Sequence, residues 1–228
     1  MARLEYSRTD VGVSAAQPAI QTKNRKWRLL TCAFVRQSWR LLTHATGRRA
    51  VQISEKFADR NATKKELDGA CLSAHKSLGC FTSIDESDWT FETMDATGAH
   101  EAAAICANDR DLIIGAMVVA RILSHTIFGV EKKPRPKILA ALRGQANLVR
   151  DLFGNPFRPI KAKPAWFARK GVNLAKSIYE KRAFDRMPML ADALEEAGCT
   201  NTDILEHCRT PAEHVRGCWV VDLLLGKE

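Results

Sequence analysis

Hydrophobic residues recur every three or four positions along most of the chain, which is the spacing of the buried face of an amphipathic α-helix. The first such stretch runs from Trp27 to Leu42 and places its arginines mostly off the apolar stripe. Stretches of the same kind predict further helices at about 47–61, 63–78, 109–128, 136–152, 166–182, 187–197 and 202–208. The pattern therefore predicts an all-α fold, a bundle-like array of about eight to nine helices.

Capping signals mark several of the expected helix starts. Thr63 and Glu66 have the spacing of a capping box, in which a threonine hydroxyl and a glutamate carboxylate satisfy free amides of the first turn. Thr210 and Glu213 repeat that spacing, and Pro211 stands at the first helical position, where proline is well tolerated. We expect helices to begin at both places.

Breaks in the pattern divide the chain into parts. Residues 1–21 lack apolar periodicity and are expected to form a flexible N-terminal arm. The segment VEKKPRPK, with two prolines and four basic residues, is the best candidate for a boundary. We predict a helical N-terminal subdomain over 22–129, containing an acidic loop at 80–98, packed against a helical C-terminal subdomain over 130–228.

Composition and charge favour a soluble cytoplasmic protein without membrane association. The N-terminal ten residues carry four charges, unlike a secretory signal, and the longest apolar run is far shorter than the roughly 20 residues that cross a bilayer. Seven cysteines, an odd number spread along the chain, suit reduced thiols. The formal net charge is +9, and it alternates between basic, acidic and basic sectors.

Cysteine and histidine gather near the C-terminus, and both are ligands that zinc prefers. A tetrahedral site built from Cys199, His207, His214 and Cys218 requires a short helix followed by a chain reversal at Pro211. The spacing lacks a C-x-x-C knuckle, so the alternative is that the cysteines are core residues and the histidines bond to backbone groups at helix ends.

Basic residues of the first sector suggest nucleic-acid binding as another function. Their side chains can neutralise phosphates, and affinity would then fall steeply with salt. The alternative is a solvated helix face, since no motif for reading bases accompanies it. The residues of this candidate phosphate-binding face are Arg25, Lys26, Arg28, Arg36, Arg40, Arg48 and Arg49.

The phrases GNPFRP, FDRMPMLADALEEAGC and HVRGCWVVDLLLGK stand out in the last third of the chain. Through these phrases, and over roughly its first and last thirds, the chain resembles a large family of uncharacterised proteins found in many copies in planctomycete bacteria. The resemblance implies a cytoplasmic bacterial protein and a shared fold. It implies no activity, cofactor or catalytic residue.

Recognised signatures of catalysis are missing from the sequence, which has no G-x-S-x-G elbow, H-E-x-x-H pair, P-loop or dinucleotide fingerprint. Triads assembled from distant residues leave no motif, so a cryptic enzyme stays open. The leading interpretation is a non-enzymatic scaffold that binds a protein partner. Nucleic-acid binding and a structural zinc site are the alternatives.

Overall fold

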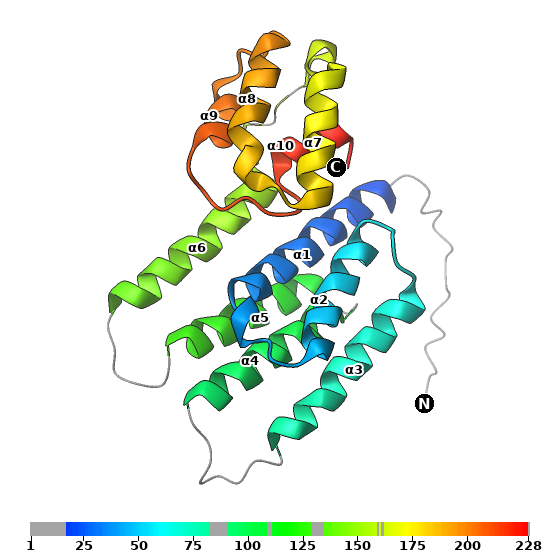
Figure 1. Cartoon of the computed structure of the whole chain (residues 1–228), viewed down its shortest axis with the longest axis vertical. Helices are drawn as coiled ribbons and strands as arrows, with labels where there is room; N and C mark the ends of the chain where they lie inside the picture. Colours follow the sequence, from blue (N-terminus) through cyan, green and yellow to red (C-terminus); the bar gives the residue numbers. More distant parts are fainter. Residues whose placement is uncertain are drawn as a thin grey trace, which may run out of the picture.

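The computed structural model describes the backbone of residues 17–82, 91–108, 111–128, 135–158, 160 and 162–227. Within these ranges the chain forms ten α-helices and three short 3₁₀ turns, with no strand, which confirms the all-α prediction (Figure 1). None of the described helices combines the length and apolar character needed to span a membrane.

The N-terminal part is a bundle whose first helix, α1, packs against four others (Figure 1). Leucine and valine side chains of α1, including Leu29, Leu30 and Val35, are at most 1% exposed and meet Val51 and Leu148. Burial of such side chains is the main favourable contribution to folding. The helices are α1 (Gln17–Gln37), α2 (Ala45–Ala58), α3 (Lys64–Thr82), α4 (Phe91–Cys106), α5 (Leu112–Phe128) and α6 (Arg135–Phe153).

The C-terminal part has a second core of its own. Its buried residues include Ile178, Leu190, Ile204 and Val221, one from each of four short helices, and each is at most 1% exposed. The helices are α7 (Arg169–Lys181), α8 (Met187–Glu196), α9 (Thr202–Arg209) and α10 (Trp219–Leu225). In Figure 1 this part lies over the C-terminal end of α6.

The division between the two cores differs from the predicted boundary at 129/130. Helix α6 contributes Leu148 and Leu152 to the N-terminal core, so the change of core falls in the proline-containing connector that follows α6. The fixed backbone dihedrals of Pro156 and Pro164 interrupt α-helix there. Helices α5 and α6, which flank the basic segment, both contribute to the N-terminal core.

Two other expectations also change. The acidic loop expected at 80–98 is shorter, because α3 continues to Thr82 and α4 already begins at Phe91. Glu92 stands in the first turn of α4, where a negative charge favours a helix. The remainder of that loop, 83–90, and most of the arm expected at 1–21 lie outside the described residues; α1 covers 17–21.

Candidate metal centre

An aspartate on the buried face of α6 forms the base of the site. Leu148, Asp151 and Leu152 follow one another at helical spacing, and all three are buried, the Asp151 side chain to 4% exposure. A buried carboxylate has a large desolvation cost unless charged or hydrogen-bonding groups meet it. The groups that meet Asp151 come from the C-terminal part of the chain.

His207 comes from the last turn of α9. The side chain of Asn201 caps the start of this helix by accepting a hydrogen bond from the Ile204 amide at 3.1 Å. At its other end the Thr210 hydroxyl donates to the carbonyl of Glu206 at 2.7 Å. These two bonds cap the two ends of the eight-residue helix whose last turn carries His207.

The segment between α9 and α10 supplies the other two groups, and it is not helical. The capping-box spacing predicts a helix from Pro211, but residues 211–215 have no regular structure. Asp151 explains the difference, since its Oδ2 accepts the Val215 amide at 2.9 Å and its Oδ1 meets His214 Nδ1 at 2.6 Å. These contacts keep residues 211–215 from forming a helix and place Cys218 next to His207.

Four ligand atoms, one each from Asp151, His207, His214 and Cys218, lie within 4.8 Å of one another. His207 Nε2 is 3.2 Å from Cys218 Sγ and 3.2 Å from Asp151 Oδ1. Donor atoms around a tetrahedral zinc ion with ordinary bond lengths are about 3.3–3.6 Å apart. The two 3.2 Å separations come close to these values, whereas the 2.6 Å contact between His214 Nδ1 and Asp151 Oδ1 is a hydrogen bond that an ion would replace. The donor set, two imidazoles, one thiolate and one carboxylate, is one that a tetrahedral ion accepts.

The site is enclosed. Cys218 is fully buried, the His214 side chain is 4% exposed, and His207, at 18%, has the most solvent contact of the four. The Trp219 ring covers His207, with ring centroids 5.1 Å apart. Solvent therefore reaches the centre from the His207 side.

The protonation states follow from this burial. Burial, reinforced by the negative charge of Asp151, raises the pKa of the Cys218 thiol well above its usual value. Burial would also raise the pKa of Asp151, but hydrogen bonds from His207 and His214 outweigh it and lower that pKa below its ordinary value. Without an ion Cys218 is a thiol, so a metal ion must displace its proton in order to bind.

One further atom in the site has an unmet bonding capacity. His214 Nε2 is buried and makes no hydrogen bond to any described residue. A buried polar atom without a partner costs free energy, and such atoms often mark a missing ion or water.

The same residues do not form a catalytic triad. In a triad the acid contacts one ring nitrogen of the histidine and the nucleophile the other. Here a single nitrogen, Nε2 of His207, faces both Cys218 and Asp151. A fully buried thiol with a raised pKa is also a poor nucleophile. Convergence of Cys218 and Asp151 on the same nitrogen of His207 suits an ion between the three residues.

Three of the four residues singled out from the sequence, His207, His214 and Cys218, come together here. Cys199 does not join them; it is buried in the C-terminal core together with Cys208. The fourth member is Asp151, which sequence reasoning missed. Its signal was an acid on the apolar face of a helix.

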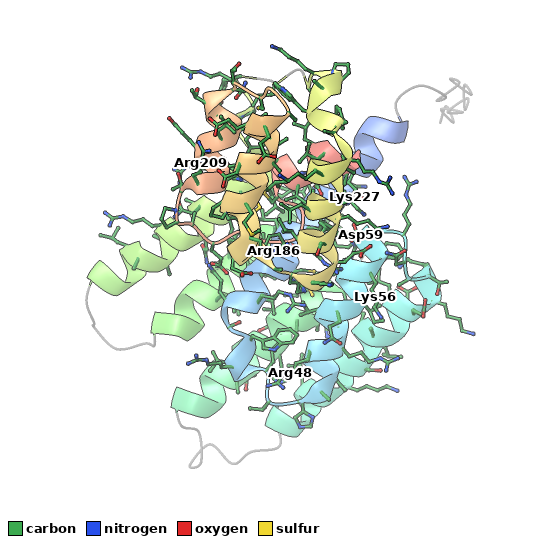
Figure 2. All side chains as sticks on the ribbon, turned by 45° about the horizontal axis from the view of Figure 1, so that its top comes forward. Arg48, Lys56, Asp59, Arg186, Arg209 and Lys227 are labelled. Atoms are coloured by element: carbon green, nitrogen blue, oxygen red, sulfur yellow. The ribbon has the colours of Figure 1, made fainter. Side chains whose placement is uncertain are left out.

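The seven basic residues expected to bind nucleic acid do not share one face. Arg36 pairs with buried Glu55, and Arg28 donates to the carbonyls of Cys106 and Asn108. Arg25 and Lys26 both pair with buried Asp222. Arg40, Arg48 and Arg49 are exposed, and Figure 2 shows Arg48 well apart from Asp59 and Lys227. Four of the seven side chains are therefore engaged inside the protein.

Comparison with protein-family models, curated proteins and solved structures finds no match to this chain. The centre is consequently interpreted from its own geometry.

Proposed function

We propose that this protein binds one zinc ion through Asp151, His207, His214 and Cys218. The observation that carries the proposal is the convergence of four donor atoms within 4.8 Å, although Asp151 and His214 are 63 positions apart in the chain. Nitrogen, sulfur and carboxylate oxygen are the donor types that zinc accepts in tetrahedral sites.

A structural role is the one this geometry supports best. Four protein ligands fill a tetrahedral shell, whereas catalytic zinc sites usually keep one position for water or substrate. The ligands also come from separate elements, with Asp151 on α6 in the N-terminal core and His207 on α9 in the C-terminal one. The ion would thus clamp the two parts of the molecule together.

Metal analysis of the full chain, purified without a histidine tag, tests the proposal. We expect about one equivalent of zinc, since structural sites bind tightly enough to survive purification. Asp151→Asn and Cys218→Ser should each lower zinc affinity by more than about 100-fold, because even the loss of a group that only supports a ligand reaches that size. In cobalt-substituted protein, the thiolate charge-transfer band should disappear in C218S.

Cys199→Ser is the matched control. Cys199 is a buried cysteine of the neighbouring core, 1% exposed, and stands outside the group of four. C199S should keep its zinc. The proposal is wrong if wild-type protein holds less than about half an equivalent, or if C199S loses the metal as completely as C218S does.

A second candidate function, binding of a protein partner, has one observation in its favour. Helix α5 exposes adjacent apolar side chains, among them Ile114 at 56% and Met117 at 67%, with Ile113 and Val118 beside them. Contiguous exposed apolar surface often marks a docking site. The occupant that fits it best is the apolar face of a partner's helix.

Charge substitution tests this second candidate. Met117→Glu should abolish photo-crosslinking of one identified partner to α5. Leu72→Glu should leave it intact, because Leu72 is similarly exposed, at 56%, but lies on α3. Equal crosslinking in both variants contradicts a partner on α5, and concentration-dependent self-association lost in M117E identifies a second copy of the chain as the occupant instead.

Nucleic-acid binding has less support, because four of its seven proposed contacts are engaged internally. Cytoplasmic location and the relationship to planctomycete proteins stay predictions.

A further inference from the structure

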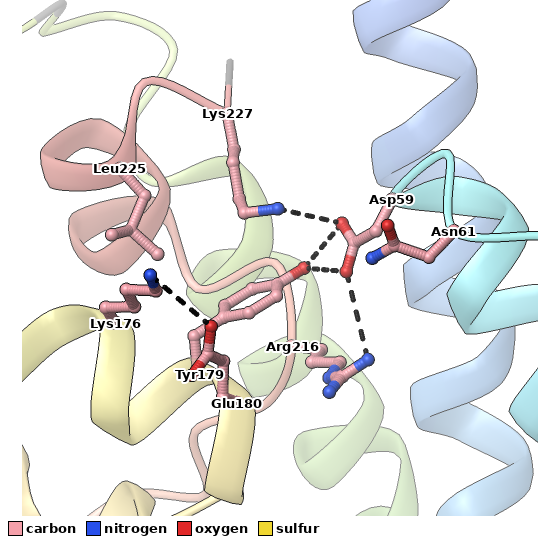
Figure 3. Close-up of a pocket in the computed structure, with 8 residues that line it drawn as sticks. All are labelled: Asp59, Asn61, Lys176, Tyr179, Glu180, Arg216, Leu225 and Lys227. Carbon is pink, nitrogen blue, oxygen red and sulfur yellow. Dashed lines mark hydrogen bonds and ion pairs between the residues drawn. The ribbon is translucent and has the colours of Figure 1, made fainter.

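A second site lies where α2, α7 and the C-terminal end of the described chain meet. It is a cavity of about 350 Å³, and Figure 3 shows its polar lining. Asp59 follows α2, Tyr179 belongs to α7, Arg216 comes from the segment before α10, and Lys227 follows α10. None of these residues belongs to the metal centre.

The two buried carboxylates at this junction are already neutralised by cations other than those lining the cavity. Asp222, fully buried, pairs with Arg25 at 2.6 Å and with Lys26 at 2.7 Å. Asp59, 2% exposed, pairs with Arg25 at 3.1 Å and accepts the Tyr179 hydroxyl at 2.7 Å on both oxygens. Tyr179 is neutral, because burial, helped by the charge of Asp59, raises its pKa far above its ordinary value.

Arg216 and Lys227 therefore have no counter-ion of their own in the described network; both lie over the Tyr179 ring, at 5.1 Å and 4.7 Å from its centroid, which leaves their charges uncompensated. Their contacts with Asp59 are long, 3.8 Å for Arg216 Nη1 and 3.5 Å for Lys227 Nζ. Arg216 Nε is buried and has no hydrogen-bond partner among the described residues. The side chains are only 20% and 30% exposed, so water screens their charges incompletely.

The surroundings add to this positive potential. Burial is the main cause that lowers the pKa of Arg182, and the positive charges of the nearby Arg36 and Arg216 lower it further. The negative charge of its partner Glu55 acts in the opposite direction. Lys176 and Glu180 also line the cavity, but they form a loose 4.0 Å pair exposed to solvent and together add no net charge. Partly buried like charges beside a cavity favour an anion there.

We infer that this cavity binds a phosphate group, with Arg216 and Lys227 as its cationic ligands. The guanidinium of Arg216 can donate a forked pair of hydrogen bonds to two phosphate oxygens, and the Lys227 ammonium supplies a point charge. The Asn61 amide is a further polar group of the lining. Asp59 also faces the cavity, but Arg25 and Tyr179 occupy its oxygens and offset its repulsion of the anion.

Titration calorimetry of the zinc-loaded full chain with inorganic phosphate tests this inference. At constant ionic strength phosphate should bind saturably, whereas chloride should not. Arg216→Gln and Lys227→Gln should each weaken binding by about tenfold or more, since each removes a charge-assisted hydrogen bond. Arg209→Gln is the control, because it removes the same charge from an exposed pair on α9 (Figure 2).

Further titrations distinguish free phosphate from a phosphorylated metabolite and test whether Glu228 already neutralises the two cations. A small phosphomonoester that binds more tightly than inorganic phosphate points to a phosphorylated metabolite, and equal affinities point to the free ion. The inference is overturned if no saturable binding occurs, or if both R216Q and K227Q bind as wild type does with unchanged helical circular dichroism. It is also overturned if phosphate binds only to Glu228→Gln, because the carboxylate of Glu228, which lies outside the described residues, is then the native counter-ion.

Discussion

Among single residues, Gly217 has the most restricted environment around the metal centre. Its φ is +91°, and a Cβ added there would lie 2.9 Å from Leu29 Cδ1, on a buried side chain of α1. Only glycine meets both conditions without strain. The backbone conformation of Gly217 therefore determines how the chain enters Cys218.

Gly217→Ala should lower the free energy of unfolding by about 2–4 kcal/mol. A non-glycine residue in the left-handed conformation costs about 1–2 kcal/mol, and the overpacked contact with Leu29 adds a cost of similar size. Gly198→Ala is the control, since φ there is +81° but nothing lies within 4 Å of the added Cβ. It should cost about 1 kcal/mol. Urea unfolding of both variants measures the difference, and equal losses would show that the contact with Leu29 is unimportant.

His100 makes the N-terminal core sensitive to pH. The residue is fully buried, and its Nε2 accepts the backbone amide of His44 at 3.1 Å. Burial, helped by the charges of His44 and Arg48, lowers its pKa to about 4. The unfolded chain therefore binds a proton at His100 between about pH 6.5 and pH 4 that the folded chain does not.

Stability should consequently fall as the pH drops below about 6.5, and the loss from this group should be complete near pH 4. His100→Asn should lose less stability than wild type between pH 7.5 and pH 5.5, measured by urea unfolding. His75→Gln, an exposed histidine of α3, should keep the wild-type dependence. A steeper dependence in H100N would contradict a neutral buried imidazole.

At the scale of helices, one buried carboxylate joins three of them. Glu55 of α2, with 5% of its side chain exposed, pairs with Arg36 of α1 at 2.6 Å and with Arg182 directly after α7. Hydrogen bonds and charge from Arg36, followed by Arg182, outweigh the cost of burial and lower its pKa. This interaction attaches α7 to the N-terminal bundle.

Glu55→Gln should destabilise the fold by about 3–5 kcal/mol, because it leaves two partly buried guanidinium groups without their counter-charge. Glu196→Gln breaks an exposed pair with Lys170 and should change stability by less than about 1 kcal/mol. Thermal unfolding followed by circular dichroism compares the two. Similar unfolding midpoints in E55Q and wild type would mean that the ion pairs of Glu55 with Arg36 and Arg182 do not hold α7 against the N-terminal bundle.

Local patterns predict the helices well because their causes lie within a few residues. The capping box at Thr63 forms as expected, with Glu66 accepting the Thr63 amide at 2.7 Å, and α6 begins and ends within one residue of its expected range. The same capping signal fails at Thr210, since contacts with Asp151, about 60 positions away, hold that segment in a non-helical conformation.

The candidate site was only partly predictable for the same reason. His207, His214 and Cys218 are close in sequence and were recognised by residue type. Asp151 is remote, and nothing local indicates which segment packs on its helix. Cys199 also had a suitable residue type. A Schellman-type turn at Gly198, in which the Cys199 amide donates to the Leu194 carbonyl, ends α8 directly before it, and the Cys199 side chain is buried in the C-terminal core.

Over the described part of the molecule, the five residues His214–Cys218 contact the candidate metal centre, the N-terminal core and the cavity. His214 and Cys218 belong to the candidate metal centre, Val215 is buried in the N-terminal core, and Arg216 lines the cavity. The Gly217 carbonyl accepts a hydrogen bond from Lys26 of α1 at 2.9 Å. A metal ion bound to His214 and Cys218 would therefore also restrict the position of Arg216, which lies between them in the chain.

Metal and phosphate should therefore be thermodynamically linked, although their binding sites share no ligand. Removing zinc with a chelator should weaken phosphate binding by about 5-fold or more, and phosphate should raise zinc affinity by the same factor, as linkage requires. Calorimetry with zinc-loaded and zinc-free protein measures one side of this cycle, and competition with a chromophoric chelator measures the other. Identical phosphate affinities in the two forms would mean that the segment is ordered without the ion. A common coupling factor would make this short connection a sensor that reports occupancy of one site to the other.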